Sequence, residues 1–252
     1  LEAQKPSEEE SIPEYLLSEE GLRKWMAALP WETNAYSAAN TLIAASQSIT
    51  AAGLRDVVVN YLIEIQNPET GFWGPAGGYA GLNAAMKASG YFTADTKPYP
   101  YIDKMLESLL KAINEEIPNT ASALWNPLTL IITAKDSYGG KIEPALQEII
   151  DKNIVKILEF EYNNLQRFKR NDGGYSYYEN SSISTSQGAP VSLGLLEGDM
   201  NSVNLCTVKF RNDCYKVAGV TPTPFFDNYR DWLWDELLNK KPIVKNLKPA
   251  SG

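Results

Sequence analysis

The sequence predicts an all-α protein built from helical hairpins. Apolar residues recur at three- and four-residue intervals over most of the 252 residues, which is the spacing of one helix face. We find no convincing alternation of apolar and polar residues of the kind that marks a half-buried strand. Charged, strongly amphipathic segments alternate with segments rich in small residues, as expected when one helix of each hairpin lines an inner ring and the other faces solvent. An irregular helical bundle is the alternative.

The elements follow in order from these patterns. Ser11 and Glu14 form a capping box, and Pro13 suits a first turn, so the first helix is expected at 12–28. Asn126 and Pro127 have the pattern of an N-cap and first turn, and Asp199 that of another N-cap. We expect one domain over 1–252 with extended tails at 1–10 and 240–252, its further helices near 34–51, 54–66, 79–90, 100–114, 127–135, 142–167, 199–217 and 226–239.

Composition excludes several partners and chemistries. The chain has 23 basic and 31 acidic residues, a net charge of -8, so it is unsuited to the phosphate backbone of nucleic acids. Its apolar runs are shorter than the roughly 20 residues that span a bilayer. With no histidine, Ser-His-Asp triads and histidine-ligated metals are excluded, and acid-base chemistry falls to Asp, Glu, Tyr or Lys. We expect no nucleic acid, membrane span, metal or cofactor.

The two cysteines are expected to be buried free thiols. Cys206 and Cys214 are eight residues apart in one predicted helix, so about 12 Å separates them, too far for a disulfide. The compartment therefore stays open: secreted or periplasmic if a leader was removed, cytoplasmic otherwise.

Two segments share an order of features that points to a repeat. Gln66, Gly71 and Trp73 place a glutamine at a helix exit and a Gly turn before aromatics, and 166–178 does the same from Gln166 with a link two residues longer. The first segment resembles the repeat of the squalene-cyclase branch of the α/α-toroid superfamily, stretched by one residue. This resemblance implies a toroid, or an incomplete one of about four and a half hairpins.

The resemblance implies a carbohydrate-active protein, because the other branches lack their motifs here. Terpenoid cyclases use DxDD or DDxxD, the zinc-dependent prenyltransferases and lanthionine cyclases use Cys and His, and complement-like thioester domains use Cys-Gly-Glu-Gln. None of these runs or ligand sets occurs in the chain. A glycoside hydrolase or a polysaccharide lyase is the expectation that remains. A non-catalytic glycan-binding or scaffold toroid and an isoprenoid-binding toroid are the alternatives.

The loops that enter the inner helices of such a ring converge on one rim. Aromatic faces with neighbouring amides and carboxylates suit a pyranose, whose C–H groups stack while its hydroxyls are hydrogen-bonded. We therefore expect an oligosaccharide or polysaccharide partner. The residues predicted to bind it are Trp31, Asn34, Tyr36, Trp73, Tyr79, Trp125, Asn126, Tyr175, Tyr178 and Asn201.

A long segment at 171–198 supplies the candidate catalytic groups. Glu197 and Asp199 would form the carboxylate pair that glycoside hydrolysis requires, with Asp172 or Glu32 as the alternative partner. A lyase would instead use a tyrosine as base and acid. The groups for that reaction are Tyr177 or Tyr178, together with Asn201 and Arg170.

Overall fold

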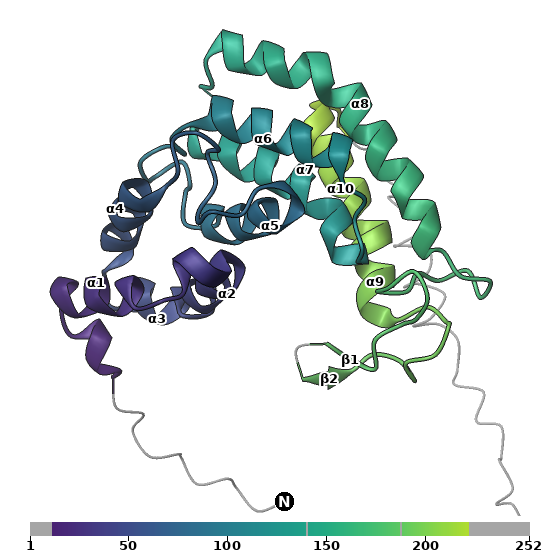
Figure 1. Ribbon diagram of the computed structural model, residues 1–252, viewed down its shortest axis with the longest axis horizontal. Coiled ribbons are helices and arrows are strands. Elements are labelled where there is room, and N and C mark those ends of the chain that lie inside the picture. The colour runs from purple at the N-terminus through teal and green to yellow at the C-terminus, as the bar shows by residue number, and fades with distance from the viewer. Residues whose placement is uncertain (1–11, 140, 187, 222–252) are drawn as a thin grey trace, which may run out of the picture. The chain divides into compact units, whose positions relative to one another are not determined.

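The computed structural model describes residues 12–139, 141–186 and 188–221, and this part of the protein is mostly helical (Figure 1). The predicted all-α class is confirmed. The elements are η1 (Glu14–Leu16), α1 (Glu19–Ala27), α2 (Trp31–Ala44), α3 (Ser46–Ala51), α4 (Arg55–Ile65), α5 (Gly78–Ser89), α6 (Ile102–Glu115), α7 (Ala121–Ser137), α8 (Pro144–Phe168), β1 (Thr185–Ser186), β2 (Ala189–Pro190), α9 (Met200–Asn204), η2 (Leu205–Lys209) and α10 (Phe210–Ala218).

Helices that are not adjacent in sequence pack side by side in a regular order. α2 packs against α5, α5 against α7, and α7 against α10. α6 contacts both α5 and α7, α8 contacts α6, α7 and α10, and α4 contacts α1 and α3. Figure 1 shows α4, α6 and α8 on the outer side of the row formed by α2, α5, α7 and α10. The toroid arrangement itself stays a prediction.

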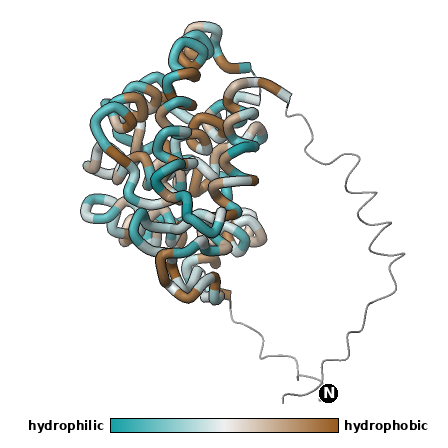
Figure 2. Tube along the Cα trace, turned by 90° about the vertical axis from the view of Figure 1, so that its right-hand side faces the viewer, coloured by the Kyte–Doolittle hydropathy of each residue, from teal (hydrophilic) through white to brown (hydrophobic). Residues whose placement is uncertain are grey.

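The two kinds of helix bury different side chains. Small residues fill the contact between α2 and α5, where Ala38, Ala39, Ala84 and Ala85 are buried and let the backbones approach closely. α6 is amphipathic instead, and its buried face is Ile102, Met105, Leu106, Leu109, Ala112 and Ile113. Figure 2 shows hydrophobic and hydrophilic residues interleaved within the helices.

The first two predicted helices have different boundaries. α1 begins at Glu19 because the hydroxyl oxygen of Ser18 accepts a hydrogen bond of 3.0 Å from the Gly21 amide, and 14–16 is a separate 3-10 turn. Ser11, the expected cap, lies outside the described residues. The helix expected at 34–51 is divided into α2 and α3.

The prediction that Asn126 and Pro127 start a helix is wrong. Thr120 is the N-cap of α7, and its hydroxyl accepts from the Ala123 amide, so Pro127 lies inside the helix. The prediction for Asp199 is confirmed, since its Oδ1 accepts from the Ser202 amide at 2.7 Å and α9 begins directly after it.

The two similar segments form similar turns. α4 ends just before Gln66 and α8 just before Lys169, and both of these residues have extended backbones. Each forms an antiparallel β-bridge with an aromatic residue on the far side of a Gly turn: Gln66 pairs with Trp73, and Lys169 pairs with Tyr175. Gly71 and Gly173 have φ angles of 67° and 85°. The residue equivalent to Gln66 is therefore Lys169 and not Gln166, which still lies within α8.

Several predictions concern residues beyond the described part. Contacts group 1–220 into one compact unit and 221–252 into a second, of which Thr221 alone is described. The tails at 1–10 and 240–252 and the helix at 226–239 lie outside the described residues, so the single domain over 1–252 stays a prediction. Among the helices that the structure describes, none is both long and apolar enough to cross a bilayer.

Candidate functional site

A small pocket lies where α2 and α5 begin, and we call it the Tyr36 pocket. Its volume is about 180 Å³. Two of the predicted binding residues, Asn34 and Tyr36, line it together with Glu32, which the sequence suggested as an alternative carboxylate. The full lining is Glu32, Thr33, Asn34, Ala35, Tyr36, Pro75, Ala76, Ala80 and Asn83.

Asn34 shapes one wall of the Tyr36 pocket. Its backbone is not helical (φ -154°, ψ 74°), so α2 is kinked there. Its side-chain Oδ1 accepts a hydrogen bond of 3.0 Å from the Ser37 amide, as an N-cap would, and this restarts the helix after the kink. A kink stabilised in this way fixes the start of the helical segment that carries Tyr36.

Tyr36 is the one aromatic residue among the described residues that line the Tyr36 pocket. The side chain is 45% exposed, and Lys87 Nζ lies 6.0 Å from the ring centroid. Partial burial, with a smaller effect of Tyr177, raises the pKa of the Tyr36 phenol above its usual value. The hydroxyl therefore stays protonated at neutral pH and can both donate and accept a hydrogen bond.

Amide groups connect this pocket to the next helix. Asn126 Nδ2 of α7 donates a hydrogen bond of 2.6 Å to Asn83 Oδ1 of α5, which orients the Asn83 side chain at the pocket wall. Asn126 is only 4% exposed, and its buried Oδ1 has no hydrogen-bond partner among the described residues. An unpaired buried acceptor is costly, so this amide pair is a place where a further donor would be stabilising.

Polar contacts continue from α7 to α10. Lys209 Nζ lies 4.6 Å from the centroid of the Trp125 ring and is ion-paired with Asp213. Asp213 also accepts a hydrogen bond of 2.9 Å from the Thr129 hydroxyl. One face of the Trp125 ring thus lies against a cation, while its buried indole N–H has no hydrogen-bond partner among the described residues.

Tyr177 and Tyr178 lie in the segment between α8 and β1. The Tyr177 hydroxyl is 2.9 Å from the Ser122 hydroxyl at the start of α7, and its ring meets that of Tyr178 edge to face at 5.0 Å. Tyr178 is exposed, whereas Tyr175 and Asn201 are half-buried. These predicted residues are thus accessible in part, but they do not line the Tyr36 pocket.

Three of the predicted binding aromatics are core residues. Trp31 and Trp73 are buried, and their indole N–H groups donate to the carbonyls of Met26 and Leu62, at 2.9 and 2.8 Å. Tyr79 is also buried, and burial raises the pKa of its phenol far above the usual value. Trp73 and Tyr79 therefore offer little surface for stacking on a sugar, whereas Trp31, 6% exposed, borders a separate hollow of about 300 Å³ next to Glu32.

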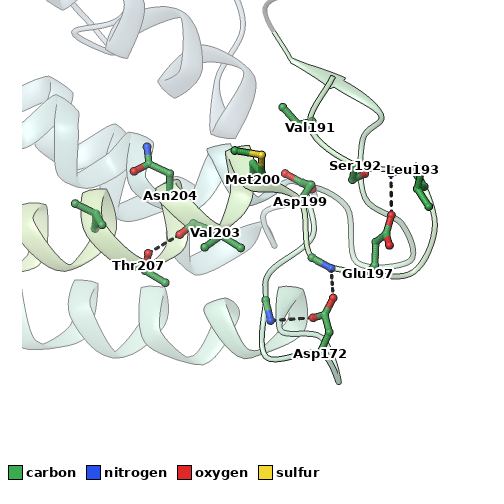
Figure 3. A pocket seen from close by; sticks show the side chains of 13 residues that line it. Asp172, Val191, Ser192, Leu193, Glu197, Asp199, Met200, Val203, Asn204 and Thr207 are labelled. Carbon is green, nitrogen blue, oxygen red and sulfur yellow. Dashed lines mark hydrogen bonds between the residues drawn. The ribbon is translucent and has the colours of Figure 1, made fainter. Parts of the chain in front are cut away.

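Three of the four predicted carboxylates, all except Glu32, meet at a different place, a hollow of about 660 Å³ that we call the Met200 hollow (Figure 3). Each of them accepts hydrogen bonds from backbone amides. Asp172 accepts from Gly174 and Gly198, both at 2.8 Å, and these bonds, chiefly the one from Gly198, lower its pKa.

The other two carboxylates are similarly engaged. Glu197 Oε1 accepts from the Leu193 amide at 2.9 Å. Asp199 is buried and caps α9, and its second oxygen accepts from the Tyr177 amide at 2.8 Å. Together with Asp172, these bonds hold the segment between α8 and α9 in place.

The groups suggested for a lyase have structural partners as well. The Arg170 guanidinium donates to the Ser176 hydroxyl at 2.6 Å and to the Arg167 carbonyl at 2.9 Å. Tyr177 is bonded to Ser122, as described above, and Asn201 lies in the first turn of α9.

The thiols are confirmed as free cysteines. Cys206 is buried and Cys214 half-buried, and burial raises the pKa of each thiol to about 12. Within the described residues, no group of three or more Cys, Asp or Glu side chains could hold a metal ion.

Sequence reasoning missed Asn83, Lys87 and Lys209. Each lies on a helix and acquires its role only through a side chain on a neighbouring helix, so neither spacing nor a motif signals it. Glu161, fully buried in α8, was missed although its position could have revealed it, because it lies four residues after Ile157 and four before Leu165, on the apolar face of the helix.

No protein-family model matches the chain, and neither does any curated protein or solved structure that was compared with it.

Proposed function

We propose that this chain is a non-catalytic glycan-binding protein whose binding site is the Tyr36 pocket. The observation that carries the proposal is the combination of a half-exposed tyrosine ring, two asparagine side chains and one carboxylate around a pocket of about 180 Å³. The ring can stack on the C–H face of a sugar while the polar groups bond its hydroxyls.

An incomplete α/α-toroid is the fold that we propose for this function. The contacts of α2 with α5, α5 with α7, and α7 with α10 suit an inner row, and α4, α6 and α8 would be its outer helices. The two similar turns after α4 and α8 support this reading, because a repeat of hairpins would recur at such exits. In this arrangement the polar contacts from Tyr36 to Lys209 extend the site along the inner row.

Binding is favoured over hydrolysis by the bonding of the carboxylates. The three carboxylates of the Met200 hollow have a structural role, because each accepts a hydrogen bond from a backbone amide and so stabilises a long loop. They are Asp172, Glu197 and Asp199. Glycoside hydrolysis requires two carboxyl groups on either side of the scissile bond. Glu32 is the one carboxylate among the described residues that line the Tyr36 pocket, and in this proposal it accepts sugar hydroxyls.

The test is a panel of neutral and acidic oligosaccharides, measured for binding by isothermal titration calorimetry and for turnover by release of reducing ends and by unsaturated-uronate absorbance. We expect at least one ligand to bind and no product to form from it. Binding should weaken about tenfold in Tyr36→Ala, because loss of stacking removes about 1.4 kcal/mol.

Tyr162→Ala is the matched control, since Tyr162 is an exposed tyrosine on the outer helix α8. Its affinity should equal that of the unchanged protein. Turnover that disappears in Glu197→Gln would show a hydrolase or lyase and would refute the non-catalytic reading. No binding to any member of the panel would refute the proposal as a whole.

A further inference from the structure

The Met200 hollow is bordered by several large apolar side chains that are exposed. Leu193 is 80% exposed and Met200 74% exposed, and Leu195, Leu196 and Val208 are exposed too. Single exposed apolar residues are ordinary, but a cluster of large ones around a hollow marks an interaction surface. Neither the fold nor the proposed glycan site uses this surface.

One side of the hollow is a helix face. Met200, Val203, Asn204, Thr207 and Val208 line it, at the spacing i, i+3, i+4, i+7, i+8. Residues 200–218 form one continuous helical run through α9, η2 and α10, and its opposite side packs on α7. The lining face therefore forms a ridge of about two turns, the second of which is π-helical in η2.

The other side of the hollow is the segment before α9. Val191 and Leu193 complete the apolar lining there, next to Ser192. This segment is held firmly, because the Ser192 hydroxyl donates to the Ile183 carbonyl and Glu197 accepts from the Leu193 amide. A partner would thus meet a pre-formed surface, which lowers the entropic cost of binding.

The charged residues that line the Met200 hollow are all acidic. They are Asp172, Glu197 and Asp199, and Figure 3 shows them around the N-terminal end of α9, while Val203 and Thr207 follow along the helix. Asp172 is exposed and Glu197 half-exposed. The charge is therefore concentrated at one end of an apolar groove, so a complementary partner is apolar along its length and cationic at the end that meets these carboxylates.

We propose that the Met200 hollow binds an amphipathic helix of a partner protein, with Lys or Arg residues placed against Asp172 and Glu197. A helix suits the site because the exposed residues of α9 and η2 form a ridge that packs into the groove between side-chain rows of a second helix. Two to three turns of such a helix would cover the ridge.

The test uses a synthetic amphipathic peptide of leucine and lysine, about 18 residues long so that it can hold a helix. A peptide with glutamate in place of lysine is the charge control. Binding is followed by fluorescence anisotropy of labelled peptide with the full chain. The variants are Met200→Ser with Val208→Ser, the matched pair Ile117→Ser with Val155→Ser at exposed apolar positions elsewhere, and Glu197→Gln.

We expect the leucine–lysine peptide to bind to the unchanged protein. Its affinity should be about tenfold lower for the Met200→Ser, Val208→Ser variant and the same for the Ile117→Ser, Val155→Ser variant. Glu197→Gln keeps an oxygen for the Leu193 amide and loses the charge, so it should weaken binding about threefold and reduce the dependence on salt. The glutamate peptide should bind at least about tenfold more weakly than the lysine peptide.

Four results would overturn the proposal. The first is an equal affinity of the Met200→Ser, Val208→Ser variant and of its matched control for the leucine–lysine peptide. The second is an equal affinity of the unchanged protein for the lysine and the glutamate peptides. The third is self-association of the chain that Met200→Ser with Val208→Ser abolishes, because a second copy would then occupy the surface. The fourth is binding to phosphatidylcholine vesicles that the same variant removes, since this would identify a lipid surface. Glycan binding at the Tyr36 pocket is independent of all four.

Discussion

Glu161 should make the protein less stable as the pH rises. Its carboxyl group is fully buried in α8, and neither oxygen has a hydrogen-bond partner among the described residues. Burial raises the pKa of Glu161 well above its ordinary value, because the charged form loses its hydration. The charge of Glu161 would raise the pKa of Tyr79 and of Cys214 on neighbouring helices, and neither of these groups is a cation at neutral pH.

The sign and size follow from proton linkage. Between the unfolded-state pKa of about 4.3 and the raised folded-state pKa, the folded protein binds one more proton than the unfolded chain, so the free energy of unfolding falls by about 1.4 kcal/mol per pH unit. This contribution is fully present below the lower pKa and is lost as the pH rises through the higher one. Glu161→Gln removes the ionisation, so the stability difference from the unchanged protein should grow at that slope.

The assay is urea unfolding at several pH values between 4 and 8, comparing the two proteins at each pH. Other carboxylates with a lowered folded pKa, such as Asp172 and Glu64, act in the opposite direction at acid pH but cancel in this difference. Glu159→Gln, an exposed change on the same helix, should give a curve parallel to that of the unchanged protein. A pH-independent difference for Glu161→Gln would show that Glu161 does not titrate with a raised pKa in the folded protein.

Three further predictions concern the loop, a turn and the thiols. Asp199→Ala should lower the free energy of unfolding by about 3 kcal/mol, because two backbone amides lose a charged acceptor. Asp199→Asn should lower it by less, and equal losses of unfolding free energy in the two variants, measured by urea unfolding, would contradict this. Gly71→Ala should lower the free energy of unfolding, measured by thermal unfolding, by about 3 kcal/mol, because the φ of Gly71 is 67° and a Cβ would collide with the Tyr101 carbonyl. A decrease below about 1 kcal/mol would argue against this turn. Cys206 and Cys214 should react with iodoacetamide at pH 7.5 only after unfolding, because burial raises both pKa values to about 12; fast labelling of the folded protein would be the contrary result.

The sequence allowed the helices with strong periodicity to be predicted closely. α4, α6 and α8 lie within a few residues of their expected ranges, because one apolar face of each is buried against neighbours. The Gly71 turn and the Asp199 cap were predictable too, since each depends on residues close in sequence. Local chemistry was decisive in these places.

Other features depend on contacts between distant residues and could not be predicted. Pro127 suggested a helix start, but Thr120 provides the cap, and packing keeps the proline inside α7. Trp73 and Tyr36 both lie near predicted loops, yet the first is buried on Phe92 and Tyr99 while the second is half-exposed. An aromatic residue in a turn does not reveal which side it faces, because that choice is made by helices elsewhere in the chain.

The most direct test of the central claim compares the association constants of Tyr36→Ala and Tyr162→Ala for one oligosaccharide that the unchanged protein binds. We predict a loss of about tenfold for Tyr36→Ala and no change for Tyr162→Ala, because of these two tyrosines only Tyr36 lines a pocket with asparagine residues. Equal affinities of the two variants would contradict it and would place any glycan site away from the Tyr36 pocket.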